Sequence, residues 1–109
     1  GKDRLLGRNG DDKLEGGFGK DELVGGSGSD TLTGGDGADR FVFYNSPDYD
    51  KIMDFEAKDT ISIGSGANNY SQLKFTDTNA GLVIEFGRAE VFLKGIDMSD
   101  IDKSNFDFF

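Results

Sequence analysis

The chain has 109 residues, with 12 basic and 21 acidic side chains and a net charge of −9. This acidity disfavours nucleic acid and anionic membranes as partners and makes cations the natural counter-charge. The sequence contains neither Cys nor His, which excludes disulfides, thiolate or imidazole metal sites and a Ser-His-Asp triad. No apolar run approaches the ~20 residues of a membrane span.

Glycine is concentrated at the start of the chain. Twelve of the 17 glycines fall in residues 1–42, and five are scattered over residues 43–109. We therefore predict one structural domain with two parts, a repetitive part (1–42) and a non-repetitive part (43–109). The chain opens with GKDRLLGRNG, without an initiating Met or a signal peptide, so we expect it to be a piece of a longer protein.

The first part is a nine-residue repeat. In nines it reads GRNGDDKLE from Gly7, GGFGKDELV from Gly16, GGSGSDTLT from Gly25 and GGDGADRFV from Gly34. An aspartate recurs every nine residues, at Asp3, Asp12, Asp21, Asp30 and Asp39. A large apolar residue follows each of them two places later, at Leu5, Leu14, Leu23, Leu32 and Phe41. Five uninterrupted matches in both columns exclude coincidence.

A period of nine does not fit a helix, and glycine at this density costs a helix ~1 kcal/mol per residue. It fits a chain that turns for six residues and is extended for three, with glycine allowing positive φ in the turn. Successive strands then alternate between two facing sheets, and 18 residues complete one coil. We expect Leu5, Leu23 and Phe41 to stack on one wall, and Leu14 and Leu32 on the other.

The same spacing stacks the aspartates along the two edges of the coil. Neighbouring coils lie ~4.8 Å apart, and carboxylates that face each other at this distance repel. A solvated acidic row does not explain why the acid always occupies the same position of a glycine turn. Carbonyl and carboxylate oxygens are the ligands that Ca²⁺ prefers. We therefore predict several calcium ions between the coils, whose binding offsets the entropy cost of ordering the glycines.

The pattern GGxGxD followed by x-apolar-x resembles the calcium-binding nonapeptide of the repeat-in-toxin (RTX) family over residues 1–42. The resemblance implies an all-β fold, a right-handed parallel β-roll. It also implies how each ion is bound. One turn supplies its second and fourth carbonyls and its Asp, and the turn one coil later supplies its first and third carbonyls and its Asp.

Carried onto this sequence, the resemblance implies three sites. The first uses Arg8, Gly10 and Asp12 with Gly25, Ser27 and Asp30. The second uses Gly17, Gly19 and Asp21 with Gly34, Asp36 and Asp39. The third uses Gly1 and Asp3 with Gly16, Phe18 and Asp21, and is one turn residue short. Arg8 departs from the family's second glycine, which makes its turn more costly.

A last site is expected where the repeat ends. The turn with Gly26, Gly28 and Asp30 needs a partner beyond Phe43. Counting nine residues on from Asp39 gives Asp48, and Asp50 lies close by. Either aspartate would complete the site. In the segment DKIMDFEAKDTISI (50–63), which resembles the region after the roll in serralysin-type proteases, lipases and alginate epimerases, the resemblance favours Asp50.

Residues 43–109 are predicted to be mainly antiparallel β. Short segments rich in β-branched and aromatic residues occur at 41–44, 51–55, 60–63, 73–75, 82–86 and 89–93. We expect this part to cap the open end of the roll, since an uncapped solenoid exposes strand edges and core. The terminal SNFDFF resembles the end of type I secretion substrates and equally fits a final strand.

Two functions follow from these patterns, and a third is considered and not expected. The leading hypothesis is a calcium-dependent folding module of a larger secreted bacterial protein, exported by a type I secretion apparatus. The alternative is an accessory module that binds an alginate-like polysaccharide, which the net charge opposes unless Lys and Arg cluster. Catalysis is not expected, because the spacing of Asp54, Glu56, Asp59, Glu85 and Glu90 singles out no pair. End-to-end self-association through the N-terminal face stays open.

Overall fold

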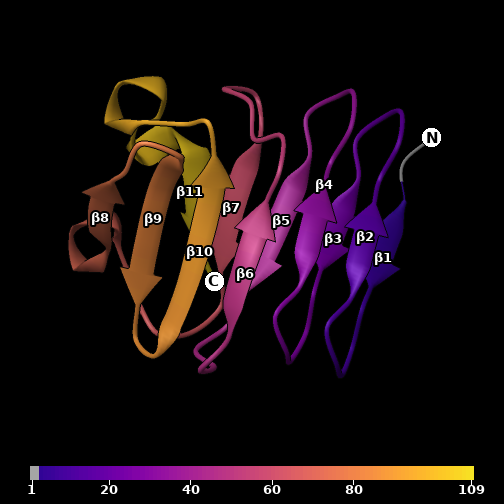
Figure 1. Ribbon diagram of the computed structural model, residues 1–109, viewed down its shortest axis with the longest axis horizontal. Coiled ribbons are helices and arrows are strands. Elements are labelled where there is room, and N and C mark those ends of the chain that lie inside the picture. Colours follow the sequence, from indigo (N-terminus) through magenta and orange to yellow (C-terminus); the bar gives the residue numbers. More distant parts are fainter. Residues whose placement is uncertain (1–2) are drawn as a thin grey trace.

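The computed structural model describes residues 3–109, which form two facing β-sheets (Figure 1). Seven strands come first: β1 (Arg4–Leu6), β2 (Lys13–Glu15), β3 (Glu22–Val24), β4 (Thr31–Thr33), β5 (Arg40–Phe43), β6 (Tyr49–Ile52) and β7 (Thr60–Ile63). Four more follow: β8 (Lys74–Asp77), β9 (Gly81–Phe86), β10 (Ala89–Lys94) and β11 (Phe106–Phe108). Short 3-10 turns cover η1 (Tyr70–Gln72), η2 (Met98–Asp100) and η3 (Lys103–Asn105). No helical turn within residues 3–109 is long and apolar enough to cross a bilayer.

Consecutive strands alternate between the two sheets. One sheet has the order β1-β3-β5-β7-β11, and the other has the order β2-β4-β6-β10-β9-β8. In the repeats the pairing is parallel and joins each residue to the one 18 positions later, as in Leu5 opposite Leu23 and Leu14 opposite Leu32. The predicted β-roll, with two repeats in each coil, is confirmed.

The core is built from the one inward apolar residue of each repeat. The stack Leu5–Leu23–Phe41 continues into Ile61 and Phe106 in one sheet. The opposite stack runs through Leu14, Leu32, Ile52 and Leu93. Leu23 and Leu32 are fully buried, whereas Leu5 and Leu14 in the first coil are only partly buried. Because a fully buried leucine contributes ~1.5–3 kcal/mol, the first coil has the least apolar stabilisation.

The parallel winding continues beyond the glycine-rich repeat. β6 pairs in parallel with β4 and β10, and β7 pairs in parallel with β5 and β11. This differs from the antiparallel pairing expected for residues 51–55 and 60–63. Antiparallel pairs join only β8, β9 and β10 among the described strands. The reason is that Asp50, within β6, and Asp59, just before β7, each lie two places ahead of an inward isoleucine, as the repeat aspartates lie two places ahead of an inward apolar residue.

Two extra residues enter the roll between β5 and β6. The pairing offset is 18 residues from Glu22 to Arg40 and becomes 20 residues from Thr31 to Lys51 and from Arg40 to Thr60. One insertion in the loop that contains Pro47 accounts for both larger offsets, since β6 and β7 resume the nine-residue spacing. The loop therefore sets where the later aspartates fall.

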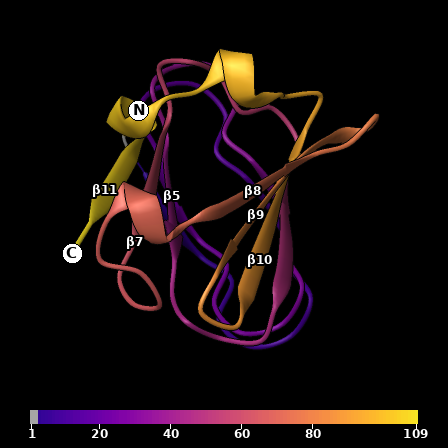
Figure 2. The same cartoon turned by 90° about the vertical axis from the view of Figure 1, so that its left-hand side faces the viewer.

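The C-terminal part covers the end of the core. In Figure 2, η1 lies near β11 and β7, and β8 runs from it toward β9, with which it pairs as the edge strand of the second sheet. Their aromatic rings form one cluster, with centroid distances of 5.3 Å from Tyr70 to Phe75, 5.4 Å from Tyr70 to Phe106 and 5.9 Å from Phe75 to Phe106. The terminal segment is thus a strand, β11, in the folded chain. The division between repeat and cap near Val42 stays a prediction.

Candidate metal centre

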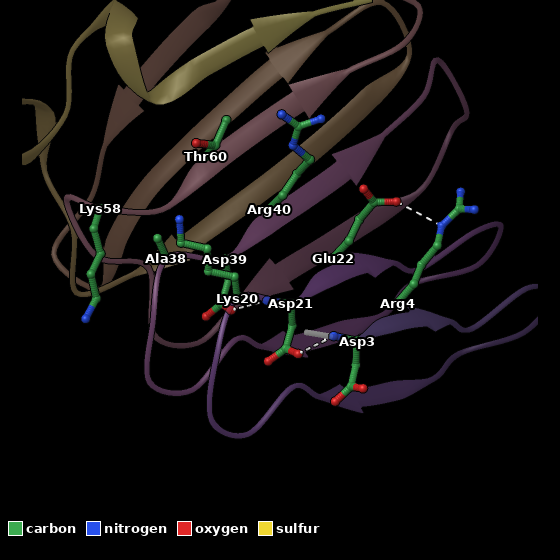
Figure 3. Close-up of a pocket in the computed structure, with 10 residues that line it drawn as sticks. All are labelled: Asp3, Arg4, Lys20, Asp21, Glu22, Ala38, Asp39, Arg40, Lys58 and Thr60. Atoms are coloured by element: carbon green, nitrogen blue, oxygen red, sulfur yellow. Dashed lines mark hydrogen bonds and ion pairs between the residues drawn. The ribbon is translucent and has the colours of Figure 1, made fainter. Parts of the chain in front are cut away.

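The repeat aspartates stack along both edges of the roll. In the first row, the backbone N–H of Asp12 donates to Oδ1 of Asp30 at 2.8 Å, and that of Asp30 donates to Oδ1 of Asp50 at 2.8 Å. In the second row the same bond joins Asp3 to Asp21 (3.0 Å), Asp21 to Asp39 (2.9 Å) and Asp39 to Asp59 (2.8 Å). Figure 3 shows Asp3, Asp21 and Asp39 side by side, with the Asp3–Asp21 and Asp21–Asp39 bonds dashed. The stacking expected from the spacing is therefore present.

The second carboxylate oxygen of each turn aspartate is left over. Among the described residues, Oδ2 is buried without a hydrogen-bond partner in Asp12, Asp21, Asp30 and Asp39. An unpaired buried polar group costs ~1–3 kcal/mol, and more when it is charged. Four such atoms in four successive turns therefore mark positions that suit a bound cation.

Burial also changes the acidity of these rows. Burial, reinforced by the charges of Asp59 and Asp21, raises the pKa of Asp39 to about 6. Burial, with the charges of Asp30 and Asp48 beside it, raises the pKa of Asp50 to about 7. Burial likewise raises the pKa of Asp30 and of Asp59. The ionised carboxylates are therefore destabilised in the folded chain until a positive charge lies close to them.

The turn carbonyls point between adjacent coils. A Cβ placed on Gly7 would lie 2.6 Å from the carbonyl oxygen of Gly25, and one on Gly16 would lie 2.6 Å from that of Gly34. The carbonyls of the second and fourth turn residues lie against the next coil. The carbonyl of Arg8 lies close to Gly26, and that of Gly10 lies close to Gly28. In the same way, the carbonyl of Gly17 lies close to Gly35, and that of Gly19 lies close to Gly37. These carbonyls lie close to the adjacent coil, and their role as calcium ligands stays a prediction.

The remaining predicted residues occupy matching turn positions. Arg8 has φ 71° and is the only non-glycine residue with positive φ in residues 3–109. Its carbonyl nevertheless faces Gly26, so the expected ligand direction is kept. The third-position side chains of Phe18, Ser27 and Asp36 are exposed, so only their backbone oxygens belong to the prediction. Gly1 lies outside the described residues, and its site is placed only through Asp3 and Asp21.

The partner of Asp30 in the last coil is Asp50 and not Asp48. Oδ2 of Asp48 accepts a hydrogen bond from the hydroxyl of Ser46 at 2.6 Å, outside the stack. Asp50 also borders a hollow of about 190 Å³ that Gly26, Ser27 and Ser46 help to line. The spacing of nine fails at Asp48 because the loop carries two extra residues.

Asp59 was missed as a member of the second row. It lies nine residues after Asp50, and Ile61 follows it two places later, as an apolar residue follows every repeat aspartate. Restarting the nine-residue count at Asp50 would have found it. The absence of glycine from residues 51–59 concealed the continued spacing.

The donor set suits a hard cation that binds backbone oxygen. No group of three or more acidic side chains converges within the described part of the chain. The acids come in pairs, so a bound ion needs carbonyl oxygens as well. Two carboxylates and four carbonyls give the six to eight oxygens, at 2.3–2.6 Å, that Ca²⁺ accepts in irregular geometry. Mg²⁺ fits less well, because it retains water and requires stricter octahedral geometry.

These features define an all-β protein of the β-roll type with two rows of stacked aspartates. The family model described as "RTX calcium-binding nonapeptide repeat (4 copies)" matches residues 1–32 and 16–43. The chain thus carries RTX calcium-binding repeats in its first 43 residues. A comparison with curated protein sequences finds no match.

Solved structures agree with this assignment. The extracellular lipase LipA from Serratia marcescens is 27% identical with a TM-score of 0.71, and the match covers 95% of this chain and 20% of the lipase. The AlgE6R3 subunit of the Azotobacter vinelandii mannuronan C5-epimerase is 27% identical with a TM-score of 0.65, covering 96% of this chain and 77% of that subunit. The chain therefore spans about a fifth of the lipase.

Proposed function

We propose that this chain is a calcium-binding module that folds when it binds Ca²⁺ and supports the secretion and stability of a larger secreted bacterial protein. The observation that carries the proposal is the buried, unpaired Oδ2 in four successive turns. The RTX repeats and the likeness to part of an extracellular lipase support it. The module itself is not the catalytic part of that larger protein.

We assign the ions to the stacked turns. One ion lies between Asp12 and Asp30 and one between Asp21 and Asp39, each with the carbonyls expected for its two turns. A third ion lies between Asp30 and Asp50, with carbonyls from Gly26 and Gly28. Because each ion joins two coils that the apolar core holds only weakly, ion binding contributes directly to the folding free energy.

The same arrangement accounts for export. Without calcium, the stacked carboxylates repel one another and oppose winding. The chain would then stay loose in a cytoplasm with little calcium and pass unfolded through a type I secretion apparatus. Outside the cell, calcium at about millimolar concentration is in the range that weak extracellular modules bind. Folding would follow export.

Circular dichroism tests this proposal. Adding Ca²⁺ to the calcium-free chain should produce a cooperative gain of β-structure, and a chelator should reverse it. Mg²⁺ at the same concentration is the control and should produce much less. A β-spectrum that stays unchanged after calcium is removed would overturn the proposal.

A second candidate function is binding of an acidic polysaccharide. Arg4, Lys20, Arg40 and Lys58 all line one hollow of about 630 Å³ beside the second row of aspartates (Figure 3). This is the clustering that an acidic chain needs to attract a polyanion. The arginines already have acidic partners, since Arg4 pairs with Glu22 at 2.8 Å and Arg40 with Asp107 at 3.5 Å. The two lysines are therefore the main candidates, and the likeness to a mannuronan C5-epimerase subunit supports a uronate ligand.

Calorimetric titration with uronate oligomers, with calcium present throughout, separates the two functions. Saturating heat at a defined ratio, lost on Lys20→Ala with Lys58→Ala, would support polysaccharide binding. The matched control is Lys13→Ala with Lys51→Ala, which removes the same charge from strands of the other sheet. No heat with the unmodified chain would reject this function and leave the calcium module intact.

A further inference from the structure

We call each pair of stacked aspartates in adjacent coils a rung. The last rung of the second row, Asp39 with Asp59, differs from the rungs within the repeat. Both oxygens of Asp59 are bound: Oδ1 accepts from the N–H of Asp39 at 2.8 Å, and Oδ2 accepts from the N–H of Glu56 at 2.8 Å. In Asp21 and Asp39 of the same row, Oδ2 is buried without a partner. Asp59 therefore offers no spare oxygen of the kind that the repeat turns offer.

Asp54, in the loop that precedes Asp59, also accepts hydrogen bonds from the preceding coil. Its Oδ1 accepts from the N–H of Gly34 at 2.9 Å, and its Oδ2 accepts from the N–H of Gly35 at 2.8 Å. One coil earlier, the N–H of Gly16 donates instead to the backbone carbonyl of Thr33 at 2.8 Å. The carboxylate of Asp54 thus takes the place of a backbone carbonyl and binds one further N–H of the turn.

The last rung of the first row, Asp30 with Asp50, is not closed by hydrogen bonds in this way. Only Oδ1 of Asp50 takes part in the hydrogen bonds of the described residues, where it accepts from Asp30. Asp50 also borders the hollow of about 190 Å³ beside Gly26 and Ser27. The last rungs of the two rows therefore differ both in free oxygens and in space.

We propose that the second row ends in a rung closed by hydrogen bonds, without an ion between Asp39 and Asp59. Asp54 is then a positioning residue. It holds the turn from Gly34 to Asp39 in the shape that presents its carbonyls to the ion between Asp21 and Asp39, although it contacts no ion itself. This inference rests on the proposed calcium sites. It limits them, because the stacking alone would place an ion at every rung.

Counting ions tests the closed rung. Native mass spectrometry at saturating calcium should show one ion fewer in Asp50→Asn than in the unmodified chain, and the full number in Asp59→Asn. The two substitutions remove the same charge from the last aspartate of each row. Loss of an ion in Asp59→Asn would overturn the closed rung. An unmodified chain that binds no calcium would instead overturn the proposed function.

Asp54→Asn tests the positioning role. Asparagine keeps one acceptor and places an amide N–H₂ against a backbone N–H, so one hydrogen bond is lost. We expect calcium affinity to fall about tenfold, which corresponds to the loss of one charged hydrogen bond, with an unchanged number of ions. The matched control Glu15→Gln removes the same charge from an exposed side chain of β2 that belongs to no proposed site and should change affinity less than about twofold.

Equal affinities for Asp54→Asn and Glu15→Gln would overturn the positioning role. Circular dichroism in calcium shows whether each variant has folded. If Asp54→Asn does not fold, the ion counts of Asp50→Asn and Asp59→Asn still decide whether the last rung is closed.

Discussion

The N–H of Asp12 donates to Oδ1 of Asp30 at 2.8 Å, and Oδ2 of both side chains is buried without a hydrogen bond. The chain thus satisfies one oxygen of the Asp30 carboxylate and leaves the other without a partner. The hydrogen bond joins equivalent residues of adjacent turns, so it supports the register that the paired strands also set. The charge must be balanced from outside the chain.

Asp21 should be more sensitive to substitution than Asp3. It stacks between Asp3 and Asp39 in the second row and belongs to the ion site proposed between Asp21 and Asp39. Asp3 is exposed and stands at the edge of the described residues. We expect Asp21→Asn to lower calcium affinity more than Asp3→Asn does, as measured by isothermal titration calorimetry. Equal losses would show that the stacking register is wrong.

Glycines in equivalent turn positions should differ in their tolerance of a side chain. Gly17 and Gly26 have φ 83° and 84°, so alanine costs either turn ~1–2 kcal/mol of left-handed strain. At Gly17 the new Cβ meets nothing within 4 Å, whereas at Gly26 it collides with the backbone of Arg8. Gly26→Ala should therefore cost more than about 3 kcal/mol and weaken calcium binding.

Gly17→Ala serves as the control for that comparison and should cost only the strain. Denaturant unfolding in saturating calcium gives both free energies of unfolding. Similar losses in the two variants would mean that adjacent turns do not approach as closely as the structure shows.

Replacing Arg8 with glycine should stabilise the first coil. Arg8 has φ 71°, a conformation that costs a residue with a Cβ ~1–2 kcal/mol. Glycine relieves this strain and loses ~0.5–1 kcal/mol through its freer unfolded chain. The net gain in the free energy of unfolding should reach about 1 kcal/mol. Arg8→Ala removes the charge but keeps the Cβ, so it should give no such gain. A lower thermal midpoint in Arg8→Gly would contradict this account.

The calcium-free chain should lose stability as the pH rises. Burial raises the pKa of Asp39 to about 6 and of Asp50 to about 7, above the ~3.9 of an unfolded aspartate. At pH values between the unfolded and the folded pKa, these two aspartates bind more protons in the folded chain than in the unfolded chain. Its free energy of unfolding is therefore highest below pH ~4 and falls through pH ~6–7.

Calcium should reverse this trend, because the ion competes with protons for the same carboxylates. The content of β-structure, measured by circular dichroism at about pH 5 and about pH 8 with chelator and then with calcium, follows both trends. Stability in chelator that rises with pH would show that these two carboxylates are not buried as acids.

The sequence was sufficient to predict the roll because one period fixes both the core and the acids. Leu23 and Asp21 recur with the same spacing, so their positions in the coil are linked. The loop around Pro47 limited what the nine-residue spacing could predict. Two inserted residues shift the count, which left Asp48 and Asp50 as alternatives and concealed Asp59.

The role of Asp54 lay outside what the pattern could predict. Its carboxylate accepts from backbone groups of Gly34 and Gly35, about one coil earlier in the chain. Hydrogen bonds from a side chain to a distant backbone leave no period in the sequence. The parallel pairing of β6 and β7 was missed for a related reason, since short apolar segments look alike in parallel and antiparallel sheets.

The alternation of strands between the two sheets sets how such a chain can change length. Deleting a single nonapeptide, such as residues 25–33, would send every later strand to the opposite wall and every later aspartate to the opposite edge. Deleting residues 16–33 would remove a whole coil and bring compatible surfaces together. Growth or shortening of the roll by duplication is therefore restricted to even numbers of units, a parity rule imposed by geometry rather than by the metal.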